Sequence, residues 1–211
     1  DRIRYTTSHP IDFSPDLISE YKNPKLANNL HLPIQSGSDL ILSKMKRKHT
    51  VLEYKSIIRK VRDIRPDIHL SSDFIVGYPG ESNHEFQKTL DFISELNFSD
   101  AYSFIYSPRP GTPAAQEFDD LSDKVKFDRL KELKDLVKQQ SLNYLKKMLG
   151  KTERVLVEGV SLKRSTEVFG RTDNNKVINF SGNRELIGKF IDVRIDEIRA
   201  NTLHGTYLSV S

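Results

Sequence analysis

The stretch from Ser72 to Glu81 (SDFIVGYPGE) combines an acid inside an apolar run with a turn rich in glycine. Asp73 stands among β-forming residues, and the run stops at Gly77 and Gly80. Glycine at a strand end lets the backbone approach a bulky ligand, and open α/β sheets bind their ligands at the carboxyl ends of strands. Because a carboxylate removed from water needs a polar partner, we expect Asp73 to face a cavity.

Two further polar segments that contain glycine follow β-prone runs. They are residues 35–39 (QSGSD) and residues 107–113 (SPRPGTP). A single glycine turn after a strand is weak evidence, because such turns are common without a ligand. Three of them at the same edge of the sheet predict a ligand site better than one. A solvated sheet face that binds no ligand stays open as the alternative.

The first 149 residues alternate β-prone runs with helical patterns. We expect helices over residues 50–64 and 82–96, and strands over residues 2–8, 30–36, 69–77 and 101–107. Thr50-x-x-Glu53 and Ser82-x-x-Glu85 are capping boxes, in which each side chain satisfies a free amide of the other residue. Ser14-Pro15 marks another helix start. Strands separated by helices imply right-handed crossovers and a parallel sheet with at least four βα units.

The four expected strands are polar on one side and apolar on the other. Helices should cover the apolar side, and the polar side then needs water or a polar ligand. The residues expected on the polar side include His31, Gln35, Ser71, Asp73, Ser103, Ser107 and Arg109. Those expected under the helices include Leu70, Phe74, Val76, Tyr102, Phe104 and Tyr106.

Residues 150–211 contain no proline and show a different pattern. Five short strands are expected, over residues 153–160, 167–172, 176–180, 190–200 and 202–210. Five strands in about sixty residues suit a small closed β-barrel that resembles the oligonucleotide-binding folds. A long helical pattern from Leu121 to Gly150 joins the two parts.

Basic, amide and aromatic side chains of the second part form a candidate nucleic-acid surface. Such groups bind phosphates and an unstacked base. The set comprises Lys163, Arg164, Phe169, Arg171, Asn174, Asn175 and Lys176. Ten basic residues against eight acidic ones is a weak excess, so a purely structural β-module stays open as the alternative.

Composition sets further bounds. The chain has 211 residues, a formal net charge of +4 and a mean hydropathy of −0.53, without an apolar run of membrane-spanning length. Zero cysteines exclude disulfides and thiolate metal ligands, and the six histidines lack ligand spacing, so we expect no metal site. No Gly-x-Ser-x-Gly elbow indicates a hydrolase. The chain begins at Asp1 within a β-prone run, from which we expect a fragment of a longer protein. Without cysteines the redox chemistry indicates no compartment, and the cytoplasm is the default expectation.

Four ordered motifs carry a family resemblance that runs over essentially the whole chain. They are LPIQSGSD (32–39), SSDFIVGYPGE (71–81), YSFIYSPRPGTPA (102–114) and GRTDNNKVINF (170–180). Together they resemble the radical S-adenosylmethionine (SAM) methylthiotransferases, and most closely the type that converts isopentenyl-adenosine beside the tRNA anticodon to its 2-methylthio derivative. The resemblance implies strands three to six of a partial (βα)6 radical SAM barrel in residues 1–149. It also implies a small RNA-binding β-barrel, the TRAM domain, in residues 150–211.

The resemblance also assigns cofactor-binding residues. The family pattern Gly-x-Ile-x-Gly-x-x-Glu is matched by Ile75 and Gly77, which would lie against the adenine of S-adenosylmethionine. Asp73 replaces the first glycine of the pattern and faces the cavity, whereas Glu81 stands one position late. The remaining assignments are Gln35 and Ser36 near the ribose and methionine parts of the cofactor, and Arg109 near its carboxylate or a substrate phosphate.

The family further requires two [4Fe-4S] clusters held by cysteines, and this chain has none. We therefore expect the chain to be inactive alone and to work with the N-terminal part of the same protein and a tRNA anticodon stem-loop. The alternatives are a stand-alone RNA-binding module, or a methylthiotransferase that acts on a ribosomal protein or on threonylcarbamoyl-adenosine.

Overall fold

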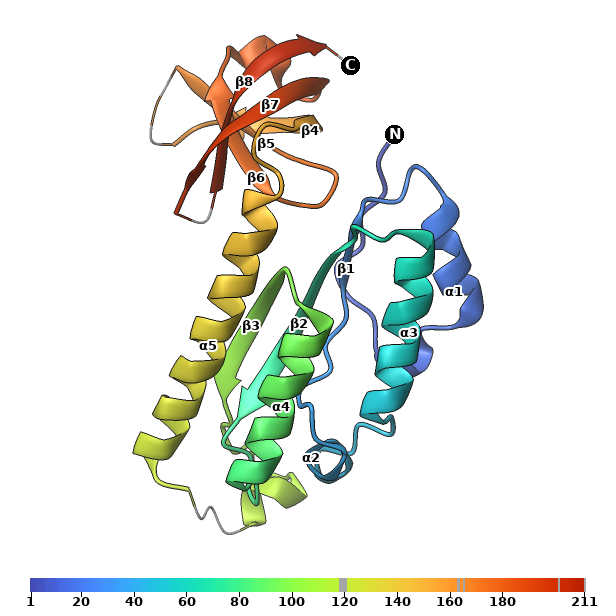
Figure 1. Cartoon of the computed structure of the whole chain (residues 1–211), viewed down its shortest axis with the longest axis vertical. Helices are drawn as coiled ribbons and strands as arrows, with labels where there is room; N and C mark the ends of the chain where they lie inside the picture. Colours follow the sequence, from blue (N-terminus) through green and yellow to red (C-terminus); the bar gives the residue numbers. More distant parts are fainter. Residues whose placement is uncertain (118–120, 163, 165, 201, 211) are drawn as a thin grey trace. The chain divides into compact units, whose positions relative to one another are not determined.

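The computed structural model describes the chain except residues 118–120, 163, 165, 201 and 211 (Figure 1). The chain divides into two compact units, one of residues 1–26 and 30–141, the other of residues 27–29 and 142–211. The division at residue 141 falls inside a long helix, α5 (Asp123–Lys146). The domain boundary between residues 149 and 150 stays a prediction.

The first unit is an α/β layer. Its sheet has the order β1-β2-β3, formed by β1 (Asn29–His31), β2 (His69–Val76) and β3 (Asp100–Ile105), and β2 runs parallel to β3. Helices α3 (Val51–Ile64) and α4 (Asn83–Leu96) lie over one face of this sheet (Figure 1). Fully buried side chains of both layers form the core, among them Leu32, Tyr54, Ile58, Phe74, Val76 and Ile93. The expected α/β class is confirmed.

Shorter elements complete the first unit. They are η1 (Pro10–Asp12), α1 (Pro15–Ser19), η2 (Glu20–Lys22), α2 (Asp39–Lys44) and η3 (Pro113–Gln116). Ser14 caps α1 as expected, and the Thr50 and Glu53 capping box is closed in both directions. The second box is only half formed, because the Glu85 carboxylate accepts a hydrogen bond from the Ser38 hydroxyl group instead.

The prediction of a strand over residues 2–8 was wrong. In that segment a single bridge pairs Ile3 with Leu26, and the Ile3 amide donates to the Lys25 carbonyl over 2.7 Å. Alternation alone does not make a strand, since each residue also needs a paired neighbour. The sheet of the described residues therefore has three strands rather than four.

The sides assigned to the residues of β3 were also wrong. The register pairs Asp73 with Tyr102 and Ile75 with Phe104, so these four side chains share one face of the sheet. Tyr102 and Phe104 are 60% and 53% exposed there, while the Ser103 hydroxyl group is buried on the helix side without a hydrogen-bond partner. The face opposite the helices is thus more aromatic than we expected.

The second unit is a closed barrel with the strand order β4-β5-β6-β8-β7. Its strands are β4 (Thr152–Val160), β5 (Glu167–Arg171), β6 (Val177–Ser181), β7 (Phe190–Arg199) and β8 (Thr202–Val210), with η4 (Arg184–Leu186) before β7. Alternate residues fill the centre, among them Val155, Val168, Ile178, Ile191, Val193 and Leu203. The five-strand barrel is confirmed, and each strand lies within about one residue of its expected bounds.

Candidate functional site

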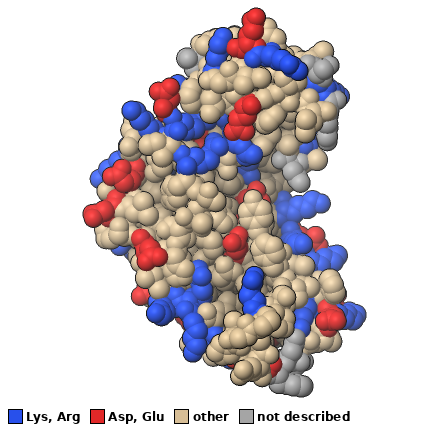
Figure 2. Space-filling model, turned by 180° about the vertical axis from the view of Figure 1, so that it is seen from behind, with Lys and Arg blue, Asp and Glu red and all other residues tan. Residues whose placement is uncertain are grey.

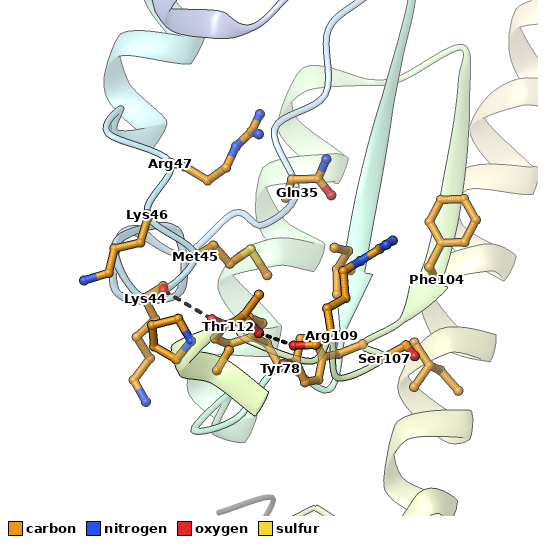
Figure 3. Close-up of a pocket in the computed structure, with 15 residues that line it drawn as sticks. Gln35, Lys44, Met45, Lys46, Arg47, Tyr78, Phe104, Ser107, Arg109 and Thr112 are labelled. Atoms are coloured by element: carbon orange, nitrogen blue, oxygen red, sulfur yellow. Dashed lines mark hydrogen bonds between the residues drawn. The ribbon is translucent and has the colours of Figure 1, made fainter. Parts of the chain in front are cut away.

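A cleft of about 640 Å³ lies at the carboxyl ends of β2 and β3 in the first unit (Figure 3). Its apolar wall comes from the strands and the turn after β2, and it consists of Ile75, Tyr78, Phe104, Ile105 and Tyr106. The rings of Tyr78 and Tyr106 meet edge to face, with centroids 4.8 Å apart. A cavity of this volume with an apolar wall suits a ligand of nucleoside size.

Cationic side chains surround the cleft. Arg47 is half-buried and donates through Nη2 to the Pro33 carbonyl over 2.8 Å, while its Nε is buried without a partner. Burial lowers the pKa of Arg47, and the charge of Asp73 opposes that shift. Arg109 extends into the cleft in Figure 3 and makes no ion pair with the described residues. These groups are able to bind a carboxylate or a phosphate.

The structure brings three of the expected cofactor residues together. Gln35, Ile75 and Arg109 all line the cleft. Gln35 has a positive φ of 84°, and its backbone joins β2 through bonds to the Asp73 carbonyl (3.0 Å) and the Ile75 amide (2.9 Å). Asp73 lies on the same face of β2 as Ile75, with its Oδ1 atom 3.4 Å from His31 Nε2.

Ser36 and Gly77 lie behind the cleft surface. Ser36 is fully buried, and its hydroxyl group contacts Thr89 Oγ1 over 3.3 Å and accepts from the Ser38 amide over 3.2 Å. Gly77 has a φ of 72°, and its amide donates to Glu81 Oε2 over 2.8 Å. Both residues therefore shape the strand ends rather than offering free polar groups.

A buried ion pair holds the turn after β2. Arg129 of α5 donates through Nη1 to the Glu81 carboxylate (2.9 Å) and the Glu81 carbonyl (2.8 Å), and through Nη2 to Asn83 (2.8 Å). Glu81 and Arg129 are 1% and 5% exposed. The acid that stands one position late in the family pattern thus fixes the loop from behind and does not face the cleft.

The sequence interpretation missed several residues of the cleft. Lys44, Met45, Lys46 and Arg47 form its rim, and Tyr78 anchors that rim by donating to the Lys44 carbonyl over 3.2 Å. A signal was present, because residues 44–49 (KMKRKH) form the densest basic run of the chain. Lys46 and Lys48 also have positive φ values, of 60° and 59°, which mark a tight irregular turn there.

The residues expected to bind nucleic acid fall into two groups in the second unit. Asn174 is 9% exposed and donates to the Tyr144 hydroxyl group over 2.8 Å, and Lys176 is 8% exposed with Nζ 5.7 Å from the Tyr144 ring centre. Arg171 and Asn175 contact each other beside them. Arg164 and Phe169 line a separate cleft of about 600 Å³, and Lys163 lies outside the described residues.

Two protein-family models match the chain. Residues 1–93 match the radical SAM superfamily, and residues 146–208 match the TRAM domain. Among solved structures, the chain is similar in fold to coproporphyrinogen III oxidase from Escherichia coli, a radical SAM enzyme. The TM-score is 0.55 at 14% identity, over 100% of this chain and 52% of that one.

Curated relatives are much closer in sequence. The chain is 56% identical to the tRNA-2-methylthio-N(6)-dimethylallyladenosine synthase of Photorhabdus laumondii and 55% identical to that of Photobacterium profundum. The matches cover 97% of this chain and 43% and 44% of the relatives, so the chain spans less than half of their length. Among the described residues, no helix combines the length and the apolar composition needed to cross a membrane.

Proposed function

We propose that this chain, which belongs to the radical SAM superfamily through its first unit and carries a TRAM domain in its second, is part of a tRNA methylthiotransferase. The whole enzyme would add a 2-methylthio group to isopentenyl-adenosine (dimethylallyl-adenosine) beside the anticodon in the cytoplasm. The observation that carries the proposal is the cleft at the ends of β2 and β3. It combines an apolar wall with an amide and several cations.

The residues of this cleft fit S-adenosylmethionine. Ile75 and Phe104 offer an apolar surface for adenine, and Gln35 offers an amide for the ribose hydroxyl groups. Arg109 or the unpartnered Nε of Arg47 would bind the methionine carboxylate. The His31 and Asp73 pair lies on the same sheet face and is placed to orient a polar group of the substrate.

The iron-sulfur clusters of the family do not fit this chain. Cluster irons are held mainly by cysteine thiolates, and the sequence contains no cysteine. The N-terminal part of the same protein would supply both clusters, and cofactor and cluster together would supply the radical chemistry. The role of the present chain is then to bind and orient the cofactor and to bind the tRNA.

The names of the relatives favour isopentenyl-adenosine over the other substrates considered, a ribosomal protein and threonylcarbamoyl-adenosine. Charge alone does not favour a stand-alone RNA-binding module, because Lys and Arg alternate with Asp and Glu on the face shown in Figure 2. RNA affinity would then depend on a few specific contacts rather than on a broad basic patch.

Deletion of the gene that encodes the whole protein tests the proposal. Mass spectrometry of nucleosides from total tRNA should show loss of the 2-methylthio derivative and accumulation of isopentenyl-adenosine. Reintroduction of the gene should restore the modification. Unchanged 2-methylthio content in the deletion strain would refute the proposed function.

A further inference from the structure

Three side chains form one row across neighbouring strands of the barrel: Phe169 on β5, Asn179 on β6 and His204 on β8. The strand register pairs Phe169 with Asn179 and Asn179 with His204, so the three stand next to one another on the same side. The residues just before them point into the core and are at most 1% exposed; they are Val168, Ile178 and Leu203. The row therefore lies on the outer surface of the barrel, where its members are half-buried.

This row lies in the second cleft, whose volume of about 600 Å³ is suited to a small ligand. Arg164 and Arg199 also line the cleft. Glu167 organises one side of it, because its Oε1 atom accepts from Arg164 Nη1 over 3.0 Å and lies 3.3 Å from His204 Nε2. Burial raises the pKa of Glu167, but the contacts with Arg164 and His204 outweigh burial and leave the pKa below its ordinary value.

The position of the Phe169 ring depends on a glycine of the adjacent strand. Gly159 is paired with Phe169, and a Cβ atom at Gly159 would come within 2.9 Å of Phe169 Cε1. The ring therefore packs against bare backbone of β4. A ring supported in this way is a preformed platform, and stacking of a base on an aromatic side chain is sequence-tolerant and favourable.

Asn179 is able to form hydrogen bonds with the edge of a base. Its amide group offers both a donor and an acceptor, and Asn179 is half-buried in the lining of the cleft. One flat ring, one amide and two cations within a single cleft match a base and its phosphate. Binding of a loop of a partner protein would not require an aromatic ring, an amide and two cations in one cleft.

We propose that the row of Phe169, Asn179 and His204 binds one unstacked nucleotide of RNA. The base would stack on Phe169 and bond to Asn179, while Arg164 and Arg199 would bind the flanking phosphates. The inference deepens the proposed function and rests on it, because the RNA is then the substrate tRNA. It also places RNA recognition on this row rather than at the turn over residues 171–176.

Fluorescence anisotropy with a labelled anticodon stem-loop RNA tests the site in the 211-residue chain. Phe169→Leu, which keeps an apolar side chain, should weaken binding roughly tenfold, because stacking on an aromatic ring is lost. Asn179→Ala should weaken it roughly fivefold, the loss expected for one hydrogen bond. Arg164→Gln should reduce the dependence of affinity on salt by about one phosphate contact.

Arg184→Gln is the matched control, since it removes an exposed cation of the second unit outside the cleft, and it should change affinity less than about twofold. Gly159→Ala checks the geometry independently, because it displaces the Phe169 ring without removing it and should weaken binding like Phe169→Leu. Circular dichroism would confirm that each variant is folded.

Wild-type affinity in Phe169→Leu and Asn179→Ala would overturn the inference, and so would a chain that binds no RNA or that binds a ribosomal protein through these residues. Wild-type affinity in the two variants would leave the methylthiotransferase proposal intact, whereas a chain that binds no RNA, or that binds a ribosomal protein, would also count against tRNA as the substrate. That proposal is decided separately, by the 2-methylthio content of tRNA in the deletion strain.

Discussion

The two units present their candidate sites in different ways. In the first unit the cleft lies at the ends of β2 and β3, and loops and a buried ion pair set its shape. In the second unit the cleft lies over the paired strands β5, β6 and β8 of the closed barrel, and residues between β4 and β5 border it. Changes to loop anchors should therefore affect the first site, whereas changes to strand register or barrel closure should affect the second.

The difference also decides what each cleft can bind. Irregular backbone at the strand ends lets the first cleft surround a compact ligand. A row of side chains across paired strands instead contacts one side of a ligand, which suits a polymer that continues beyond the contact. We therefore propose that the cleft binds the cofactor and that the row binds RNA.

The largest effect is expected from Arg129→Met in the first unit. Loss of one partner leaves Glu81 buried and uncompensated, which typically costs about 3–5 kcal/mol. Hydrogen exchange should show faster exchange of the β2 amides and of the Gly77 amide, which donates to Glu81, with the barrel amides unchanged. Lys131→Met, which removes an exposed pair with Asp135, is the control and should change little. Equal effects of the two variants would contradict a loop fixed by the ion pair.

Gly205→Ala should damage the second unit and spare the first. A Cβ atom there would lie 2.2 Å from the Arg194 carbonyl oxygen, so β7 and β8 would have to separate. Overpacking of this kind costs about 1–3 kcal/mol, measured as a lower denaturation midpoint of the barrel signal. Gly182→Ala is the control, because its nearest contacts are side-chain atoms at 3.0 Å that are able to move. If Gly205→Ala left the barrel stability unchanged, closure would not control the second site.

Arg109→Gln should weaken S-adenosylmethionine binding in the whole cluster-loaded protein roughly tenfold, because a charge-assisted hydrogen bond is worth about 1.5–3 kcal/mol. Equilibrium dialysis with labelled cofactor measures this change. Arg59→Gln on the exposed side of α3 removes the same charge away from the cleft and should bind normally. Binding by Arg109→Gln at wild-type affinity would remove Arg109 from the cofactor site.

The smallest effect is expected from Thr50→Ala at the start of α3, where loss of the cap should cost about 1 kcal/mol and leave both clefts intact. Hydrogen bonds from the Thr50 backbone and side chain lower the pKa of Glu53 below 4.5. The hydrogen bonds between Thr50 and the ionised Glu53 therefore stabilise the folded state above pH 4.5, and this stabilisation is lost as pH falls through the lowered pKa of Glu53. Urea unfolding at pH 7 and pH 3 should show a smaller difference between wild type and Thr50→Ala at pH 3. A difference that did not depend on pH would argue against the closed box.

The fold of the second unit was easier to predict than that of the first unit, whereas its candidate site was harder to predict. Buried and exposed residues alternate along parts of its strands, and turn signals separate the strands, so their bounds follow from the pattern. The row of Phe169, Asn179 and His204, in contrast, joins residues up to 35 positions apart through strand pairing. Only the barrel register brings them together.

The first unit shows the opposite behaviour. Its strand-end motifs are local, so Gln35, Ile75 and Arg109 were predicted from short stretches of sequence, and all three line the cleft. The side of Tyr102 and Phe104 was not recognised, because apolar side chains were expected under the helices and the register of β3 against β2 is not local. The strand over residues 2–8 failed for a related reason, since only Ile3 finds a pairing partner.

Steady-state kinetics of the whole cluster-loaded enzyme test the division of labour between the two units most directly. Arg109→Gln should raise the KM for S-adenosylmethionine and leave the KM for tRNA unchanged, while Phe169→Leu should do the reverse. If both variants changed the same constant, or if neither changed any, the assignment of cofactor to the cleft and RNA to the barrel would be contradicted.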